Sequence, residues 1–226
     1  MKTTSPATTS KKATSPAKTV KPAKASAPVA KVAVKTESNI QNLLDALQVR
    51  IDNAPNANQA ESFTTEKNAF SRFASAFGRV SQEYQIDLNA LAKRIATTDQ
   101  KSDHFIAIYA ITKVRQATTA LATTSKTGFD GYTNAILFNL SRLQNLSNKE
   151  ARMTMTTAIE YDELEQVQAI RRTKECKEST ARTQASSSRM MLSVLGICNI
   201  SKRKQNDVIS FSDSATANAV LSMYQQ

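Results

Sequence analysis

The chain has no tryptophan, one histidine, two cysteines, four glycines and five prolines in 226 residues. So few glycines and prolines do not suit a β-sandwich or an α/β barrel, whose many turns consume both residues. We therefore predict a mainly helical fold. One histidine and two cysteines are too few for a zinc finger or a disulfide framework. The apolar runs are only a few residues long, far short of the roughly 20 residues of a membrane-spanning helix, and the polar, lysine-rich N-terminus does not resemble a secretory signal.

The charge of the chain is unevenly distributed along its length. Residues 1–36 hold eight lysines and no acidic residue, and residues 171–204 hold nine basic residues against two acidic ones. Between these blocks, residues 37–170 hold 13 basic and 15 acidic residues. Two basic blocks therefore flank a nearly neutral body, and this segregation favours a polyanionic partner over a general solubilising role.

Residues 1–38 form the first of three expected regions. They consist almost entirely of Lys, Ala, Pro, Ser, Thr and Val, and no Leu, Ile, Phe or Tyr occurs before Ile40. We predict that this tail is disordered, because it cannot bury enough apolar surface to offset the entropy lost on ordering.

The composition of the tail resembles that of linker-histone tails, and Ser15-Pro16-Ala17-Lys18 is similar to their S/T-P-x-K units. The resemblance implies similar chemistry, not common ancestry: lysines near a phosphate backbone release counterions and bind without sequence preference. The alternative is a solubilising linker or a tail that binds acidic proteins. The tail residues expected to contact nucleic acid are Lys11, Lys12, Lys18, Lys21 and Lys24.

Residues 39–172 form the expected helical body, with about six helices by the periodicity of their apolar residues. Ile40–Ile51 and Phe63–Val80 both follow helical spacing, and the second stretch carries four of the eight phenylalanines. Such a stripe is typical of core packing, although a nucleotide-stacking platform is the alternative. Helix N-caps are expected at Asp87, Asp103 and Ser147 or Asn148. The side chains expected inside are Phe70, Phe73, Phe77, Phe105, Ile108, Tyr109, Ile136 and Leu140.

Residues with catalytic or metal-binding chemistry are scarce. The sequence contains no P-loop, no glycine-rich dinucleotide loop and no nucleophile motif. His104 is the only histidine and lacks the base, nucleophile and orienting group of a catalytic set. Four acidic residues, Glu160, Asp162, Glu163 and Glu165, would be spread around a single helix and would not converge on a cation. We expect no enzymatic activity, no cofactor and no metal.

Residues 173–226 form the third expected region, a basic α+β module. The stretch ASSSRMMLSVLGI predicts a helix that begins at Ser186–Ser188 and ends at Gly196. Two β-prone segments, Ile197–Ser201 and Val208–Ser212, are joined by a polar loop and predict a hairpin. A last helix is expected over Ala215–Tyr224.

A helix followed by a hairpin with a basic tip is the layout of the winged-helix variant of the helix-turn-helix. In this interpretation Ser186–Arg189 begin the recognition helix, and the hairpin loop forms the wing against the phosphate backbone. The alternative is a small α+β cap on the body with a solvated basic loop. The candidate nucleic-acid-binding residues here are Arg171, Arg172, Lys174, Arg182, Ser186, Ser188, Arg189, Lys202, Arg203 and Lys204.

The function expected from these patterns is non-enzymatic nucleic-acid binding through the cationic arm and the basic C-terminal module. DNA is favoured over RNA because the sequence has no RRM aromatic motif, GxxG loop or OB-type strand series. The alternative is a viral or phage structural or assembly protein whose basic tail contacts packaged genome or an acidic shell. No membrane partner is expected, and homo-oligomerisation is left open. Two unpaired cysteines favour a reducing intracellular compartment, the nucleus in a eukaryotic host, or a virion interior.

Overall fold

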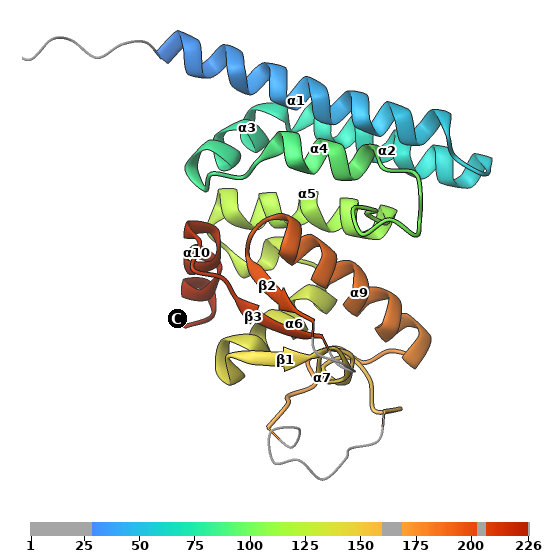
Figure 1. Cartoon of the computed structure of the whole chain (residues 1–226). Coiled ribbons are helices and arrows are strands. Elements are labelled where there is room, and N and C mark those ends of the chain that lie inside the picture. Colours follow the sequence, from blue (N-terminus) through green and yellow to red (C-terminus); the bar gives the residue numbers. More distant parts are fainter. Residues whose placement is uncertain (1–28, 160–168, 203–206, 226) are drawn as a thin grey trace, which may run out of the picture.

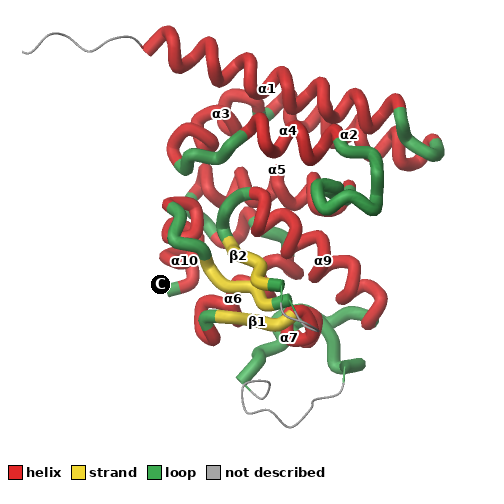
Figure 2. Tube along the Cα trace, viewed as in Figure 1, coloured by secondary structure: helices red, strands yellow, loops and turns green. Residues whose placement is uncertain are grey.

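The computed structural model describes residues 29–159, 169–202 and 207–225. Within them the chain is mainly helical and contains a small three-stranded antiparallel sheet formed in its C-terminal half (Figure 2). The predicted mainly helical class with a C-terminal hairpin is confirmed. Several residues singled out above lie outside the described residues: Lys11, Lys12, Lys18, Lys21, Lys24, Glu160, Asp162, Glu163, Glu165, Arg203 and Lys204.

The first four helices form a layer, drawn in blue to green in Figure 1. The first helix packs lengthwise against the second and fourth, and its Leu43 and Leu47 are fully buried. The side chains of Asn56 and Asp87 cap the second and fourth helices by accepting backbone amide hydrogens. The predicted role of Asp87 is therefore confirmed. The helices are α1 (Val29–Asp52), α2 (Ala57–Arg72), α3 (Ala74–Glu83) and α4 (Leu88–Ala96).

Helix α5 (Ile108–Thr123) lies between this layer and the rest of the protein (Figure 1). It contacts α2 and α3 as well as α9, so it is buried around most of its circumference. A short 3-10 helix, η1 (Lys126–Gly128), folds back on its C-terminal end. A Cβ added to Gly128 would lie 2.5 Å from backbone atoms of Ala120, so only glycine fits at this crossing.

The remaining elements form a second layer around the sheet, in yellow to red in Figure 1. The strand order is β1-β3-β2, and Leu146, Ile209 and Ile200 face one another across the three strands. Strand β1 comes from the stretch 39–172 and pairs with a strand of the stretch 173–226. The elements are α6 (Gly131–Leu143), β1 (Asn145–Ser147), α7 (Asn148–Met153), α9 (Glu178–Val194), β2 (Cys198–Ser201), β3 (Val208–Phe211) and α10 (Ala215–Tyr224).

Several expected boundaries in this second layer are confirmed. Ser147 caps α7 in a capping box, accepting from the Glu150 amide while the Glu150 carboxylate accepts from the Ser147 amide at 2.6 Å. The hairpin β2–β3 and helix α10 lie where the sequence predicted them. Strand β1 was not predicted, because its three residues carry no strand pattern of their own.

Three predicted boundaries among helices α1 to α5 are wrong. Helix α1 begins at Val29, directly after Pro28, so residues 29–38 are helical and not part of the tail predicted to be disordered. The stripe over 63–80 is divided at Phe73, which ends α2 and precedes α3. Asp103 caps no helix, because α5 begins only at Ile108 after Ala107.

The predicted core is confirmed for four of its eight members, Phe70, Phe77, Ile136 and Leu140, and two others are exposed. Phe73 is 48 % and Tyr109 is 56 % exposed, whereas Phe105 and Ile108 are half-buried. Phe73 sits at the break between two helices, so it leaves the stripe that continues from Phe70 to Phe77. Phe70 and Phe77 meet edge to face, with ring centroids 5.2 Å apart.

Candidate nucleic-acid interface

Helix α9 is longer than the sequence predicted. It begins at Glu178, so Ser186, Ser188 and Arg189 lie in its interior, and the prediction that they begin the helix is wrong. The extra turns form because small residues extend its buried side toward the N-terminus. Those fully buried positions, at helical spacing, are Ala181, Ala185, Ser188 and Leu192. Alanines and a serine carry a weaker hydrophobic signal than leucines, which is why this part of the stripe was missed.

The N-terminal half of α9 presents one continuous polar face to solvent. We call this face the α9 stripe; its exposed residues are Ser179, Arg182, Thr183 and Ser186, at spacing i, i+3, i+4 and i+7. Lys177, also exposed, stands at the N-cap position just before it. The stripe therefore combines a guanidinium with three hydroxyl groups that can both donate and accept hydrogen bonds.

Arg182 is the most accessible cation of the stripe, with a side chain 72 % exposed. Its guanidinium lies 3.2 Å from the Glu178 carboxylate one turn earlier, and the same carboxylate lies 3.6 Å from Arg152 of α7. Exposed pairs of this kind contribute only about 0.3–0.5 kcal/mol to stability. Arg182 can therefore exchange Glu178 for a phosphate or a base edge at little cost.

Ser188 and Arg189 instead connect α9 to its neighbours. The Ser188 hydroxyl is fully buried and lies 2.9 Å from the Thr133 hydroxyl of α6. The Arg189 guanidinium is 2.7 Å from the carboxylate of Asp207, which precedes β3, and its side chain is only 12 % exposed. Both residues position α9, the first against α6 and the second against the hairpin. They are not presented to solvent as the stripe is.

The hairpin carries one described cation at its open end. Lys202, just after β2, has a side chain 81 % exposed and approaches the 90 % exposed Asp103 at 4.0 Å. An ion pair this exposed contributes almost nothing, so the lysine is available to an anion. Arg203 and Lys204, the other two predicted tip residues, lie outside the described residues.

The segment before α9 runs alongside α6 and holds the remaining predicted cations. The side chain of buried Asn139 binds the backbone of Arg171 twice, accepting from its amide and donating to its carbonyl, each at 2.7 Å. The Arg171 guanidinium lies over the ring of Phe138, and the Lys174 ammonium lies over the ring of Tyr132. Arg172 is half-buried and donates to the Thr156 carbonyl. Arg171 and Lys174 thus lie on α6, whereas Arg172 is bound to Thr156, and none of the three belongs to the α9 stripe.

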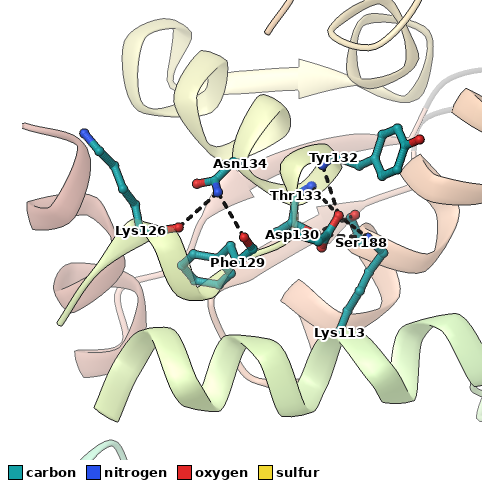
Figure 3. Close-up of polar contacts among 8 residues, drawn as sticks. All are labelled: Lys113, Lys126, Phe129, Asp130, Tyr132, Thr133, Asn134 and Ser188. Atoms are coloured by element: carbon teal, nitrogen blue, oxygen red, sulfur yellow. Dashed lines mark hydrogen bonds and ion pairs between the residues drawn. The ribbon is translucent and has the colours of Figure 1, made fainter. Parts of the chain in front are cut away.

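A buried polar network joins α5, α6 and α9 beneath the stripe (Figure 3). The Lys113 ammonium is 2.7 Å from the carboxylate of Asp130, the N-cap of α6, and the Thr133 hydroxyl donates to that carboxylate at 2.6 Å. Ser188 completes the chain through Thr133. The network fixes the orientation of α9 relative to the other two helices.

The protonation of this network follows from its burial. Burial lowers the pKa of Lys113, and the neighbouring Asp130 carboxylate only partly offsets this effect. For Asp130, burial alone would raise the pKa, but the Lys113 ammonium and the hydrogen bonds from Thr133 outweigh it and hold the pKa below its usual range. Asp130 is therefore ionised at neutral pH, as a partner of the buried ammonium.

Other reactive side chains do not form a site in the part of the chain that the structure describes. His104 is exposed, and no group of three or more His, Cys, Asp or Glu residues converges there. Burial raises the pKa of both the Cys176 and the Cys198 thiol. Among the same residues, no helix has the length and apolar character needed to cross a membrane.

Comparison with known proteins gives no relative for this chain: no family model, no curated protein and no solved structure matches it.

Proposed function

We propose that this protein binds nucleic acid, with a preference for duplex DNA, through a winged-helix module that presents the α9 stripe. The observation that carries the proposal is the topology of the second layer. A winged helix runs helix, strand, helix, helix, hairpin, and its first strand pairs with the last strand of the hairpin. Here α6, β1, α7, α9, β2 and β3 follow in that order, and the sheet order is β1-β3-β2.

One feature departs from that pattern. The second and third helices of a helix-turn-helix are joined by a turn of about three or four residues, whereas residues 154–177 separate α7 from α9. The packing nevertheless supports the assignment, because α9 contacts α6, α7 and β2. In the part of this segment that the structure describes, Arg171 is held against Asn139 of α6, and the residues of the α9 stripe are exposed.

The exposed groups of α9 suit the major groove of a duplex. Recognition helices contact base edges with the side chains of their N-terminal turns, and the α9 stripe occupies the first two to three turns of its helix. Arg182 has the fork geometry that pairs with guanine or with a phosphate. Lys177 and Lys202 would contact the phosphate backbone, which contributes affinity without sequence preference.

The test is a mobility-shift assay of the full chain with duplex DNA, duplex RNA and single strands over a salt series. We expect duplex DNA to bind most tightly and its affinity to fall steeply with salt. Arg182→Ala should weaken duplex binding about tenfold or more, as loss of a specific arginine contact does. Arg79→Ala is the matched control, because Arg79 is also an exposed arginine but lies on α3 in the other layer.

Two results would contradict the proposal. Equal loss of affinity in the Arg182 and Arg79 variants would mean that the α9 stripe is not the interface. Large oligomers at low salt without nucleic acid, together with a silent Arg182 variant, would favour a structural or assembly protein instead. Sedimentation of the same preparations separates these outcomes.

A further inference from the structure

A second basic surface lies on α6, and the α9 stripe does not include it. We call it the α6 patch; it consists of Phe138 with Arg142 and Arg171. The guanidinium carbons of Arg142 and Arg171 lie 5.4 Å and 5.3 Å from the centroid of the Phe138 ring, so two positive charges share one aromatic side chain. Both arginines are exposed, and Phe138 is half-buried.

The α6 patch is held in place from below. Asn139 is 1 % exposed, and its side-chain amide forms two hydrogen bonds of 2.7 Å with the backbone of Arg171. A buried amide used in this way fixes the segment that carries the guanidinium, which lowers the entropy lost when Arg171 binds a ligand. The patch is therefore preorganised, unlike a chance cluster of mobile surface arginines.

Among the described residues, the two arginines of the patch have no acidic partner. Within the described residues, neither Arg142 nor Arg171 is in an ion pair, whereas Arg182 and Arg189 of α9 each have one. Two like charges on one ring repel each other, and an anion placed between them removes that cost. Arginine forks match phosphate oxygens well, so a phosphate group is the ligand that this arrangement fits.

The α6 patch and the α9 stripe face in opposite directions. The contact between their helices is the hydrogen bond of Thr133 with Ser188 (Figure 3). At about 100° per residue, Phe138 and Arg142 lie roughly 140° and 180° around α6 from Thr133. By the same count, the four residues of the α9 stripe lie roughly 120° to 180° around α9 from Ser188, with Arg182 at about 120°. Each surface therefore points away from the helix that carries the other.

From this geometry we propose that the α6 patch binds the phosphate backbone of a second nucleic-acid segment, so that one molecule holds two duplexes. The inference rests on the proposed function, in which the α9 stripe holds the first duplex. A duplex in the α9 stripe cannot also lie against the far side of α6. The patch has no stripe of hydrogen-bonding side chains comparable to that of α9, so we expect the second contact to be independent of sequence.

A capture assay tests the inference on the full chain. A duplex fixed to beads is saturated with protein, washed, and offered a second, labelled duplex. The variant Arg142→Gln/Arg171→Gln should bind the fixed duplex within about threefold of the unsubstituted protein but retain at least fivefold less of the labelled one. The control Arg72→Gln/Arg79→Gln removes the same charge from exposed arginines of α2 and α3 and should capture normally.

The outcomes are distinct. If the patch variant captures as much labelled duplex as the control, the inference is overturned, and bridging belongs to the tail or to self-association. If it loses affinity for the fixed duplex to the same degree, the patch is part of the first interface and the inference is also overturned. If no version of the protein retains the fixed duplex, the proposed function itself has failed. Should the double variant melt early, Arg142→Gln alone, at an exposed site, should still lower capture.

Discussion

At the scale of single residues, the Lys113–Asp130 pair carries the largest electrostatic consequence. Lys113 is 3 % exposed and its ammonium lies 2.7 Å from the carboxylate that caps α6. Breaking such a pair by removing one partner leaves an uncompensated buried charge, which typically costs about 3–5 kcal/mol. The pair also has a direct structural role, because Asp130 and Thr133 continue the network to Ser188 of α9.

Lys113→Met should therefore lower the free energy of unfolding by about 3 kcal/mol at pH 7, and by less in acid. The lowered pKa of Asp130 contributes stability above the pKa of the unfolded carboxyl, and this stability is lost as the pH falls through the folded pKa. In the variant, burial without the ammonium raises the pKa of Asp130, so its penalty disappears on protonation. Urea unfolding of the variant and of the unsubstituted protein at pH 7 and pH 4 measures the loss of stability at each pH. A loss that is larger at pH 4 than at pH 7 would contradict the argument.

The exposure of an aromatic side chain also depends on its exact position in the chain. Phe70 and Phe73 lie three residues apart in one apolar stripe, yet Phe70 is 1 % and Phe73 is 48 % exposed. The helical spacing alone does not distinguish them. The break between α2 and α3 falls at Phe73 and turns its side chain out of the stripe.

At the scale of elements, the crossing of η1 over α5 leaves no space for a side chain at the point of contact. Gly128 lies so close to the Ala120 backbone that a Cβ would come within 2.5 Å of it, and neither backbone segment can yield as a flexible side chain does. The crossing sets the direction in which the chain leaves α5, and hence the position of Asp130 at the start of α6.

Gly128→Ala should lower the free energy of unfolding by about 2 kcal/mol, because overpacking of this kind forces a backbone shift. Gly131→Ala is the matched control: a Cβ there would meet only the Lys174 side chain at 3.6 Å, an ordinary contact. The control substitution should leave the free energy of unfolding unchanged or raise it slightly, since alanine has a higher helix propensity than glycine. Denaturant midpoints of the two variants provide the comparison, and equal midpoints would contradict the close approach.

At the scale of the whole molecule, the described residues form two layers with α5 between them, packed around one continuous core that extends from α1 to α10. The α9 stripe and the α6 patch both belong to the second layer, and both of their helices are tied to α5 through the buried network. Six of the eight lysines of the first basic block precede α1 in the sequence, in a stretch with no Leu, Ile, Phe or Tyr that could join such a core. The effect of this stretch on binding should therefore be separable from the fold.

Removal of residues 1–28 should leave the melting temperature within about 2 °C, because those residues include no Leu, Ile, Phe or Tyr that could join the core. The truncated protein should bind every nucleic acid more weakly by a similar factor, with a shallower dependence on salt, since the lysines act by counterion release. Mobility shifts on preferred and random duplexes measure this. A loss of affinity confined to one duplex sequence would show instead that the tail distinguishes between nucleic-acid sequences.

The features that the sequence determined by itself are those whose interactions join residues of one short stretch of chain, within a helical turn for the caps and between adjacent strands for the hairpin. The caps at Asp87 and Ser147, the hairpin and the boundaries of α10 depend on hydrogen bonds or alternation spanning about four residues, so a pattern in the sequence was sufficient to predict them. The concentration of cations in 171–204 could be read in the same way.

Tertiary structure decided the features that depend on contacts between distant segments. Strand β1 exists because it pairs with β3 more than 60 residues later, and α9 starts at Glu178 because small residues of its N-terminal half are buried against the rest of the fold. Contacts between distant segments also give the basic residues different roles. Arg189 is paired with Asp207 and the backbone of Arg171 is bound by Asn139, while the side chain of Arg182 is exposed. A basic residue has the same charge in every position, and only the packing around it determines whether that charge is paired inside the protein or offered to a ligand.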